Sequence, residues 1–92
     1  MVKGAEFSRK VLDNGLTVIH ERRKIPVVAT ASSVRYGAQY ESEDIKGISH
    51  FIEHLVFKGT KKRRVDEIPR EVESKGGILN AFTGEEITCF WN

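Results

Sequence analysis

The sequence has 92 residues, of which 39% are hydrophobic and 30% are charged, with a net charge of +2 and one cysteine. This length suits one small domain, and the low net charge argues against a nucleic-acid or anionic-membrane partner. No apolar run reaches the roughly 20 residues that a membrane span needs. The single cysteine, Cys89, excludes an intrachain disulfide and favours a reducing compartment, so we expect a cytoplasmic protein.

Three strands are expected before the first helix. Residues 7–12 and 16–20 flank Asp13-Asn14-Gly15, a turn signal because asparagine and glycine tolerate positive φ, and together they predict a hairpin. Pro26 lacks a backbone N–H group and therefore interrupts strand pairing. Residues 27–36 are rich in β-branched and small side chains and predict a longer third strand.

A polar loop over residues 39–46 leads into a predicted helix from about Ile48 to Phe57. Its apolar residues cover a broad arc, so we expect a mostly buried helix. These residues are Ile48, Phe51, Ile52, Leu55 and Val56. The remaining sector of the helix carries His50, Glu53 and His54.

A second helix is predicted over residues 67–75, and strands over residues 78–83 and 87–91 follow it. The order of these elements predicts an α+β fold, with an antiparallel-rich sheet and two helices packed on one face. The last strand is rich in aromatic residues and is followed by no turn. We therefore expect residues 1–92 to form a partial domain that is truncated at its C-terminal end.

His50, Glu53 and His54 form the pattern His-x-x-Glu-His, which is known from zinc peptidases. Residues i, i+3 and i+4 share one face of a helix, so both imidazoles can reach one metal ion with a carboxylate beside them. Zinc lowers the pKa of water towards ~7, and a nearby carboxylate can then accept the proton. The alternative is that the three residues only form the polar edge of a buried helix.

The residues around this pattern carry a family resemblance. Residues 47–60 resemble the zinc helix of the pitrilysin-type (M16) metallopeptidases, which include the mitochondrial processing peptidase β-subunit and small bacterial and archaeal zinc proteases. Residues 73–83 resemble the family's Gly-Gly-x-x-Asn-Ala-x-Thr segment, and residues 12–18 resemble its first hairpin. The loop at residues 38–41 departs from the family because it lacks the arginine common there.

The resemblance implies a zinc metalloendopeptidase that cleaves unfolded peptides, with His50 and His54 as zinc ligands and Glu53 as the catalytic base. It also implies that Asn80 and Ala81 lie on an edge strand that binds substrate by β-augmentation. The family's third zinc ligand is a glutamate on a later helix, and these 92 residues do not contain it. We therefore expect an N-terminal fragment of a clamshell enzyme, inactive alone and dependent on the remainder of the parent chain or on a second subunit.

An uncovered sheet edge further predicts that such a fragment self-associates. Two other functions stay open: a non-catalytic partner subunit, although such subunits usually lose the three motif residues, and a stand-alone metal-binding assembly module. Zinc titration of the chain beside a peptidase assay separates these alternatives.

Four further features could have a functional role, but each of them also has a simple structural explanation. The basic run 61–64 lacks interleaved aromatic residues and fits a solvated loop better than a nucleic-acid site. Cys89 could be a ligand or a reactive thiol, but a small buried strand residue is the favoured interpretation. The turn residues 85–86 could lend a substitute ligand, although such glutamates are usually solvated. His20 has no partner at metal-binding spacing and is expected at the surface.

Overall fold

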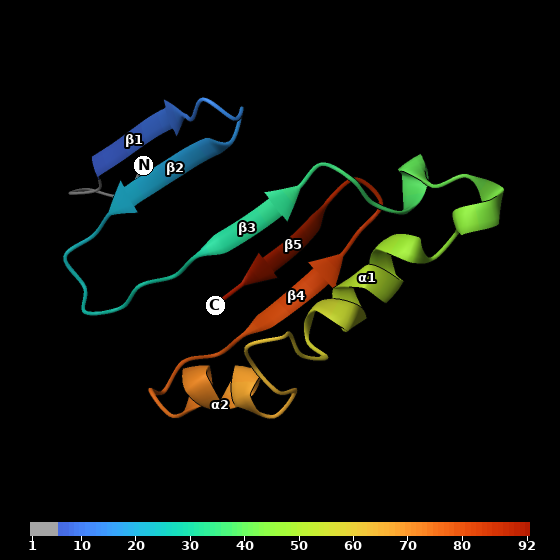
Figure 1. The fold of residues 1–92 in the computed structure, drawn as a ribbon. Coiled ribbons are helices and arrows are strands. Elements are labelled where there is room, and N and C mark those ends of the chain that lie inside the picture. Colours follow the sequence, from blue (N-terminus) through green and yellow to red (C-terminus); the bar gives the residue numbers. More distant parts are fainter. Residues whose placement is uncertain (1–5) are drawn as a thin grey trace.

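The computed structural model describes residues 6–92, so the first five residues of the predicted domain lie outside the described part. In chain order the elements are β1 (Glu6–Val11), β2 (Thr17–Arg22), β3 (Ala31–Val34), the short 3-10 helices η1 (Ala38–Tyr40) and η2 (Glu43–Ile45), α1 (Ile48–Val56), α2 (Glu67–Glu73), β4 (Asn80–Thr83) and β5 (Thr88–Trp91) (Figure 1). Every paired strand is antiparallel. The α+β class and the order of strands and helices are therefore confirmed.

The predicted hairpin is formed by β1 and β2, which pair in register from Glu6 opposite Arg22 to Val11 opposite Thr17. Its turn depends on Gly15, whose φ of 87° is a conformation that a residue with a Cβ adopts only at a cost. The Asn14 side chain accepts a hydrogen bond from the Leu16 N–H group at 3.0 Å. The local turn chemistry therefore favours this hairpin and its register.

The five strands form two sheets, where the sequence suggested one: the β1–β2 hairpin and a three-stranded sheet in the order β3-β5-β4. Residues 23–30, which include Pro26, separate the hairpin from the second sheet. The predicted strand over residues 27–36 is wrong in length, because β3 covers only Ala31–Val34. Its neighbour β5 pairs with it over four residues, and Thr30 and Asn92 add one more backbone pair.

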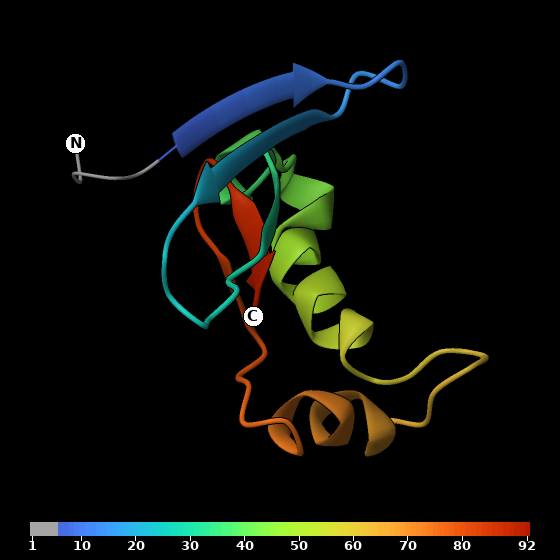
Figure 2. The ribbon, with the colours of Figure 1, turned by 90° about the vertical axis from the view of Figure 1, so that its left-hand side faces the viewer.

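The two helices differ in how they meet the sheet. Helix α1 lies beside β4, whereas α2 lies beyond one end of the three-stranded sheet (Figure 2). Neither helix among residues 6–92 combines the length and apolar character that a bilayer span needs.

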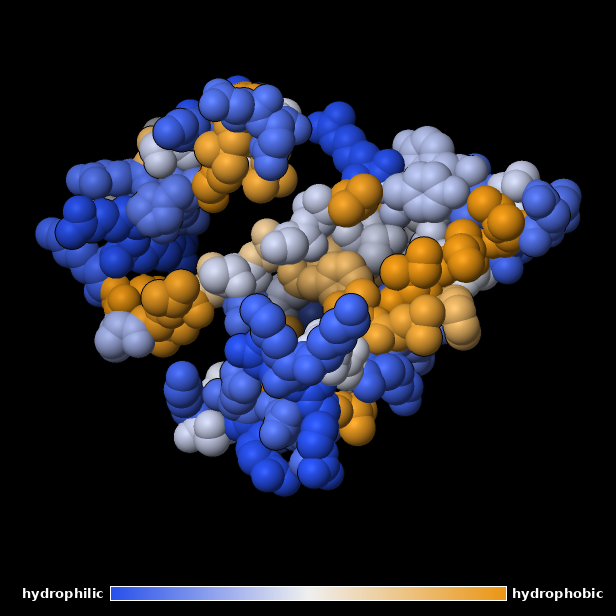
Figure 3. Space-filling model, in the orientation of Figure 1, coloured by the Kyte–Doolittle hydropathy of each residue, from blue (hydrophilic) through white to orange (hydrophobic). Residues whose placement is uncertain are grey.

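The predicted burial of α1 is wrong for the described structure. Phe51 is 59% exposed and Leu55 is 48% exposed, because β4 covers only one side of the helix. Figure 3 shows apolar residues gathered over α1 at the surface. The Cα radius of gyration is 16.1 Å, whereas a compact domain of this length has about 12 Å. Residues 6–92 therefore form an open arrangement, with few buried side chains to hold α1 in place.

Candidate metal centre

The two histidines of the motif face each other on α1. Their Nε2 atoms lie 2.9 Å apart, and their ring centroids lie 4.6 Å apart with an angle of 69° between the planes. The spacing of four residues is about one helical turn, so both rings leave the helix on the same side. Both side chains are exposed, which leaves their paired nitrogens open to a ligand.

This donor pair fits a zinc ion. Two nitrogen ligands of a tetrahedral zinc site lie about 3.3 Å apart, because each Zn–N bond is about 2.0–2.1 Å long. The observed separation is about 0.4 Å shorter, a difference that small side-chain rotations remove. Within residues 6–92, no group of three His, Cys, Asp or Glu side chains is placed to hold a metal. The turn residues Glu85 and Glu86 therefore do not replace the third ligand.

Glu53 is held by a residue from a different element. The Thr83 hydroxyl at the end of β4 donates a hydrogen bond to Oε2 of Glu53. The two residues are 30 positions apart in the sequence, and both side chains are half-buried. The carboxylate therefore lies against the sheet. In this arrangement Glu53, His50 and His54 do not form a group of three side chains that could hold one metal ion.

The start of α1 is held by Glu41, a residue six positions before the N-cap. Gly47 occupies the N-cap position with a φ of 90° and has no side chain to cap the helix. Instead, Oε1 of Glu41 accepts a hydrogen bond from the Gly47 N–H group, and Oε2 accepts one from the Ser49 N–H group, both at 2.8 Å. These contacts satisfy helix N–H groups that have no partner within α1 and place a negative charge at the positive end of its dipole.

The same contacts set the ionisation of Glu41. The Ser49 side chain and the backbone N–H groups of Ser49 and Gly47 hold the pKa of the Glu41 carboxyl below its ordinary value of 4.5. Because the folded chain favours the ionised form, the stabilisation is complete above pH 4.5 and is lost as the pH falls through the lowered pKa.

We therefore expect Glu41→Gln to reduce the thermal stability of α1 at pH 7, because the neutral amide offers one acceptor oxygen and no charge. The difference from the unsubstituted chain should disappear when the pH is below the folded-state pKa of Glu41. Thermal unfolding followed by far-UV circular dichroism at both pH values measures this. Glu43→Gln is the matched control, because Glu43 forms an exposed ion pair with Lys46 and leaves the helix N–H groups alone. An equal effect of both substitutions would contradict the capping role of Glu41.

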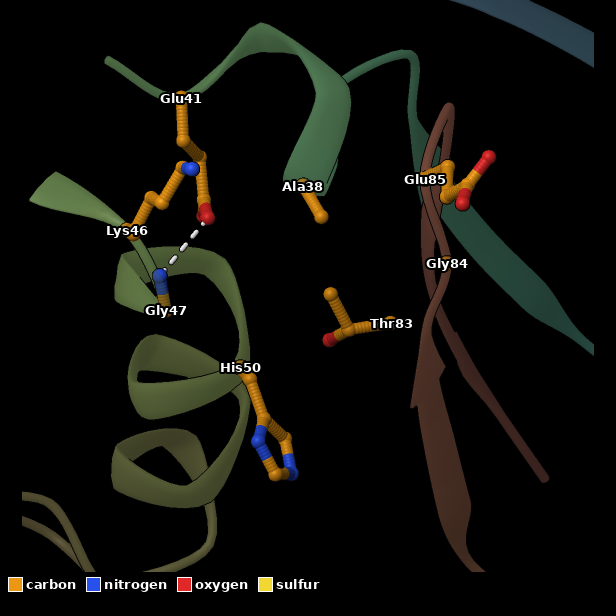
Figure 4. A pocket seen from close by; sticks show the side chains of 8 residues that line it. All are labelled: Ala38, Glu41, Lys46, Gly47, His50, Thr83, Gly84 and Glu85. Carbon is orange, nitrogen blue, oxygen red and sulfur yellow. Dashed lines mark hydrogen bonds between the residues drawn. The ribbon is translucent and has the colours of Figure 1, made fainter. Parts of the chain in front are cut away.

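A cavity of about 420 Å³ lies next to His50, between the start of α1 and the turn that joins β4 to β5. Its lining includes Glu41, Thr83 and Glu85, and Figure 4 shows His50 and Thr83 on opposite sides of it. The η1 segment closes one wall, because the Ala38 N–H group donates to Gly84 O and the Gln39 N–H group donates to Glu85 O, both at 3.0 Å. The cavity thus lies between the face of α1 that carries His50 and the sheet.

The predicted substrate-binding residues lie on the expected edge strand. β4 pairs only with β5 in the described sheet, so its other edge is free, and Asn80 and Ala81 begin it. Ala81 and Thr83 are half-buried, whereas Asn80 and Phe82 are exposed. The alternation of a strand therefore directs Ala81 and Thr83 towards α1, with Asn80 on the opposite face. The edge-strand placement is confirmed, and substrate binding stays a prediction.

The other residues that the sequence singled out take the structural roles that it favoured. Cys89 is buried on β5, and His20 is exposed on β2, away from α1. In the basic run 61–64, Arg63 pairs with Glu71 at 2.9 Å and Arg64 pairs with Asp66 at 3.3 Å. These ion pairs are exposed, as expected of a solvated loop.

Sequence reasoning missed two residues of the site. Thr83 belongs to the recognised Asn-Ala-x-Thr segment, yet no local pattern pairs it with Glu53. Glu41 lies too far before the helix for a normal capping signal, which occupies the residue directly before the first turn.

Comparison with known proteins identifies the family. The family model described as "Insulinase (Peptidase family M16)" matches residues 16–91. The chain belongs to this family. The match includes residues 47–60 and 73–83, whose resemblance to this family the sequence showed.

The M16 relatives include a zinc protease, a processing peptidase subunit and a subunit of a cytochrome b-c1 complex. An uncharacterized zinc protease of Rickettsia bellii is 39% identical over 94% of this chain and 21% of its own length. The mitochondrial-processing peptidase subunit beta of Rattus norvegicus is 40% identical over 87% of this chain and 16% of its own length. The cytochrome b-c1 complex subunit 1 of Bos taurus is 42% identical over 87% of this chain and 17% of its own length.

The fold of this M16 chain also matches a solved structure. A protease from Helicobacter pylori superposes with a TM-score of 0.87 and 32% sequence identity, over 95% of this chain and 21% of that chain. The chain thus spans about one-fifth of the length of the proteins it matches.

Proposed function

We propose that this chain supplies the histidine pair and the general base of a zinc metalloendopeptidase that cleaves unfolded peptides. The observation that carries the proposal is the 2.9 Å separation of the His50 and His54 Nε2 atoms, with Glu53 held one turn from His50. Membership of a peptidase family supports the same reaction class. The names of two relatives, a zinc protease and a processing peptidase, agree with it.

Each residue has a defined task in this proposal. His50 and His54 each offer one imidazole nitrogen to the metal. Bound zinc supplies a Lewis acid that polarises a peptide carbonyl and makes water acidic near neutral pH. Glu53 accepts a proton from water and delivers it to the leaving amine. The free edge of β4 offers backbone groups to an extended peptide, which would then lie along the strand that ends at Thr83.

The third metal ligand comes from outside these residues in our proposal. Catalytic zinc sites use three protein ligands, and the described residues bring together two. A carboxylate from further residues of the same polypeptide, or from a second subunit, completes the set. The length of the relatives, about five times that of this chain, is compatible with either source.

We expect the 92-residue chain alone to bind zinc and to hydrolyse no peptide. Two imidazoles give a weak site, and Glu53 can act only on water held by a complete ligand set. Zinc titration by calorimetry and an assay with an unfolded, quenched-fluorescent peptide measure the two properties. Glu53→Gln is the matched control, because it leaves both nitrogen ligands in place and should bind zinc as the unsubstituted chain does.

Two outcomes would contradict this. Turnover that Glu53→Gln abolishes would show that no third ligand is needed. Absence of zinc binding at millimolar concentrations would refute the proposed metal site itself.

A second candidate is a non-catalytic assembly subunit, which the 42% identity to a cytochrome b-c1 complex subunit favours. A peptidase assay of the chain together with the residues that complete the site separates the candidates, because an assembly subunit hydrolyses no peptide. The geometry of His50, Glu53 and His54 supports the peptidase.

A further inference from the structure

The hydrogen bond from Thr83 to Glu53 links two elements of the candidate site. It is the one side-chain hydrogen bond that joins α1 to β4 among residues 6–92. Within the same residues, Oε1 of Glu53 accepts no hydrogen bond, so the carboxylate has one engaged oxygen and one free oxygen.

Thr83 is a rigid donor for two reasons. Its backbone is fixed in the sheet, where it pairs with Thr88 of β5. Its β-branched side chain has restricted rotation about χ1. A glutamate side chain has three rotatable bonds, so without a fixed partner its carboxylate would sample several positions.

Thr83 also faces the cavity that His50 lines. The bond therefore holds the Glu53 carboxylate at the boundary between the metal-binding face of α1 and the cavity. The strand that holds it is the strand whose free edge is available to an extended peptide. A peptide paired along β4 would therefore have a fixed position relative to Glu53, because β4 would hold both the peptide and, through Thr83, the carboxylate.

We infer that Thr83 is a positioning residue for Glu53: it fixes one carboxylate oxygen and leaves the other free to accept a proton from water. This role rests on the proposed peptidase function. General-base catalysis needs hydrogen-bond geometry within a few tenths of an ångström, and a displacement of about 1 Å can cost about 100-fold in rate. Thr83 contributes through Glu53 and touches no reacting atom itself.

The test compares Thr83→Val, which keeps the shape of the side chain but removes the hydroxyl, with Thr83→Ser, which keeps the hydroxyl. Side-chain couplings and 13C relaxation of Glu53, measured by NMR on the 92-residue chain, report its rotamers. We expect one dominant Glu53 rotamer in the unsubstituted chain and in Thr83→Ser, and averaging over several rotamers in Thr83→Val. Thr88→Val is the control, because it removes a hydroxyl from the paired position of β5 without touching Glu53.

Zinc affinity is measured on the same samples and should change less than about twofold, since His50 and His54 are untouched. Averaged Glu53 rotamers in the unsubstituted chain would overturn the inference, and so would an unchanged single rotamer in Thr83→Val. The inference would also be overturned if Glu53 in Thr83→Ser or in Thr88→Val averaged over rotamers as much as it does in Thr83→Val. The hydroxyl of Thr83 would then have no specific role. Loss of zinc binding in every sample would refute the peptidase proposal. The NMR result would still show whether Thr83 fixes the Glu53 side chain.

Discussion

Replacing His50 or His54 with alanine should lower the zinc affinity of the chain by about 100-fold or more, since even outer-shell partners of metal ligands contribute about 10–100-fold. The reason is that the two Nε2 atoms converge at 2.9 Å and act as a chelating pair. One remaining imidazole binds zinc no better than a free histidine side chain does. The double variant should therefore bind scarcely more weakly than either single variant, a non-additivity expected of groups that act together.

His20→Ala is the matched control for this measurement. His20 is also an exposed histidine, but it lies on β2, in the other sheet. Competition with a chromophoric chelator gives the affinities, and circular dichroism checks that α1 persists in each variant. A loss of affinity in His20→Ala as large as that in His50→Ala would show that zinc binds outside the proposed pair.

Replacing Gly37 with alanine should destabilise the chain by about 1–3 kcal/mol, because the added methyl group overpacks a closed junction. A Cβ atom at this position would clash with the Gly84 carbonyl oxygen and would lie 2.7 Å from the Glu85 carbonyl oxygen. Both oxygens belong to backbone that accepts hydrogen bonds from Ala38 and Gln39, so neither can move aside freely. Glycine is needed here because there is no room for a side chain. Its backbone conformation does not require glycine, since any residue can adopt a φ of −164°.

Gly84→Ala provides the control from the same junction. A Cβ atom at Gly84 would meet its nearest atom, the Ile87 carbonyl oxygen, at 3.5 Å, which is an ordinary contact. Thermal unfolding should give a Tm lower by about 5 °C or more in Gly37→Ala and nearly unchanged in Gly84→Ala. Amide hydrogen exchange should show faster exchange at Ala38 and Gln39 in Gly37→Ala. Equal Tm values for the two variants would mean that η1 is not fixed to the β4–β5 turn.

Features that depend on neighbouring residues were predicted correctly from sequence. The Asp13-Asn14-Gly15 turn and the placement of His50, Glu53 and His54 on one helix follow from the local backbone. Features that depend on partners far away in the sequence were not predicted correctly. The length of β3 is limited by pairing with β5, and the exposure of Phe51 and Leu55 follows from what covers α1. Hydrophobic periodicity shows which face of a helix can be buried, but burial itself requires a neighbouring element.

The sequence by itself determined that this chain carries two neighbouring imidazoles and a carboxylate on one helix, because residues one helical turn apart lie together in any α-helix. The tertiary structure alone decided how these groups are held. Glu41 caps the helix from a loop, and Thr83 reaches Glu53 from a strand 30 residues away. The orientation of the Glu53 carboxylate depends on how α1 packs beside β4, and no spacing within the motif encodes that packing.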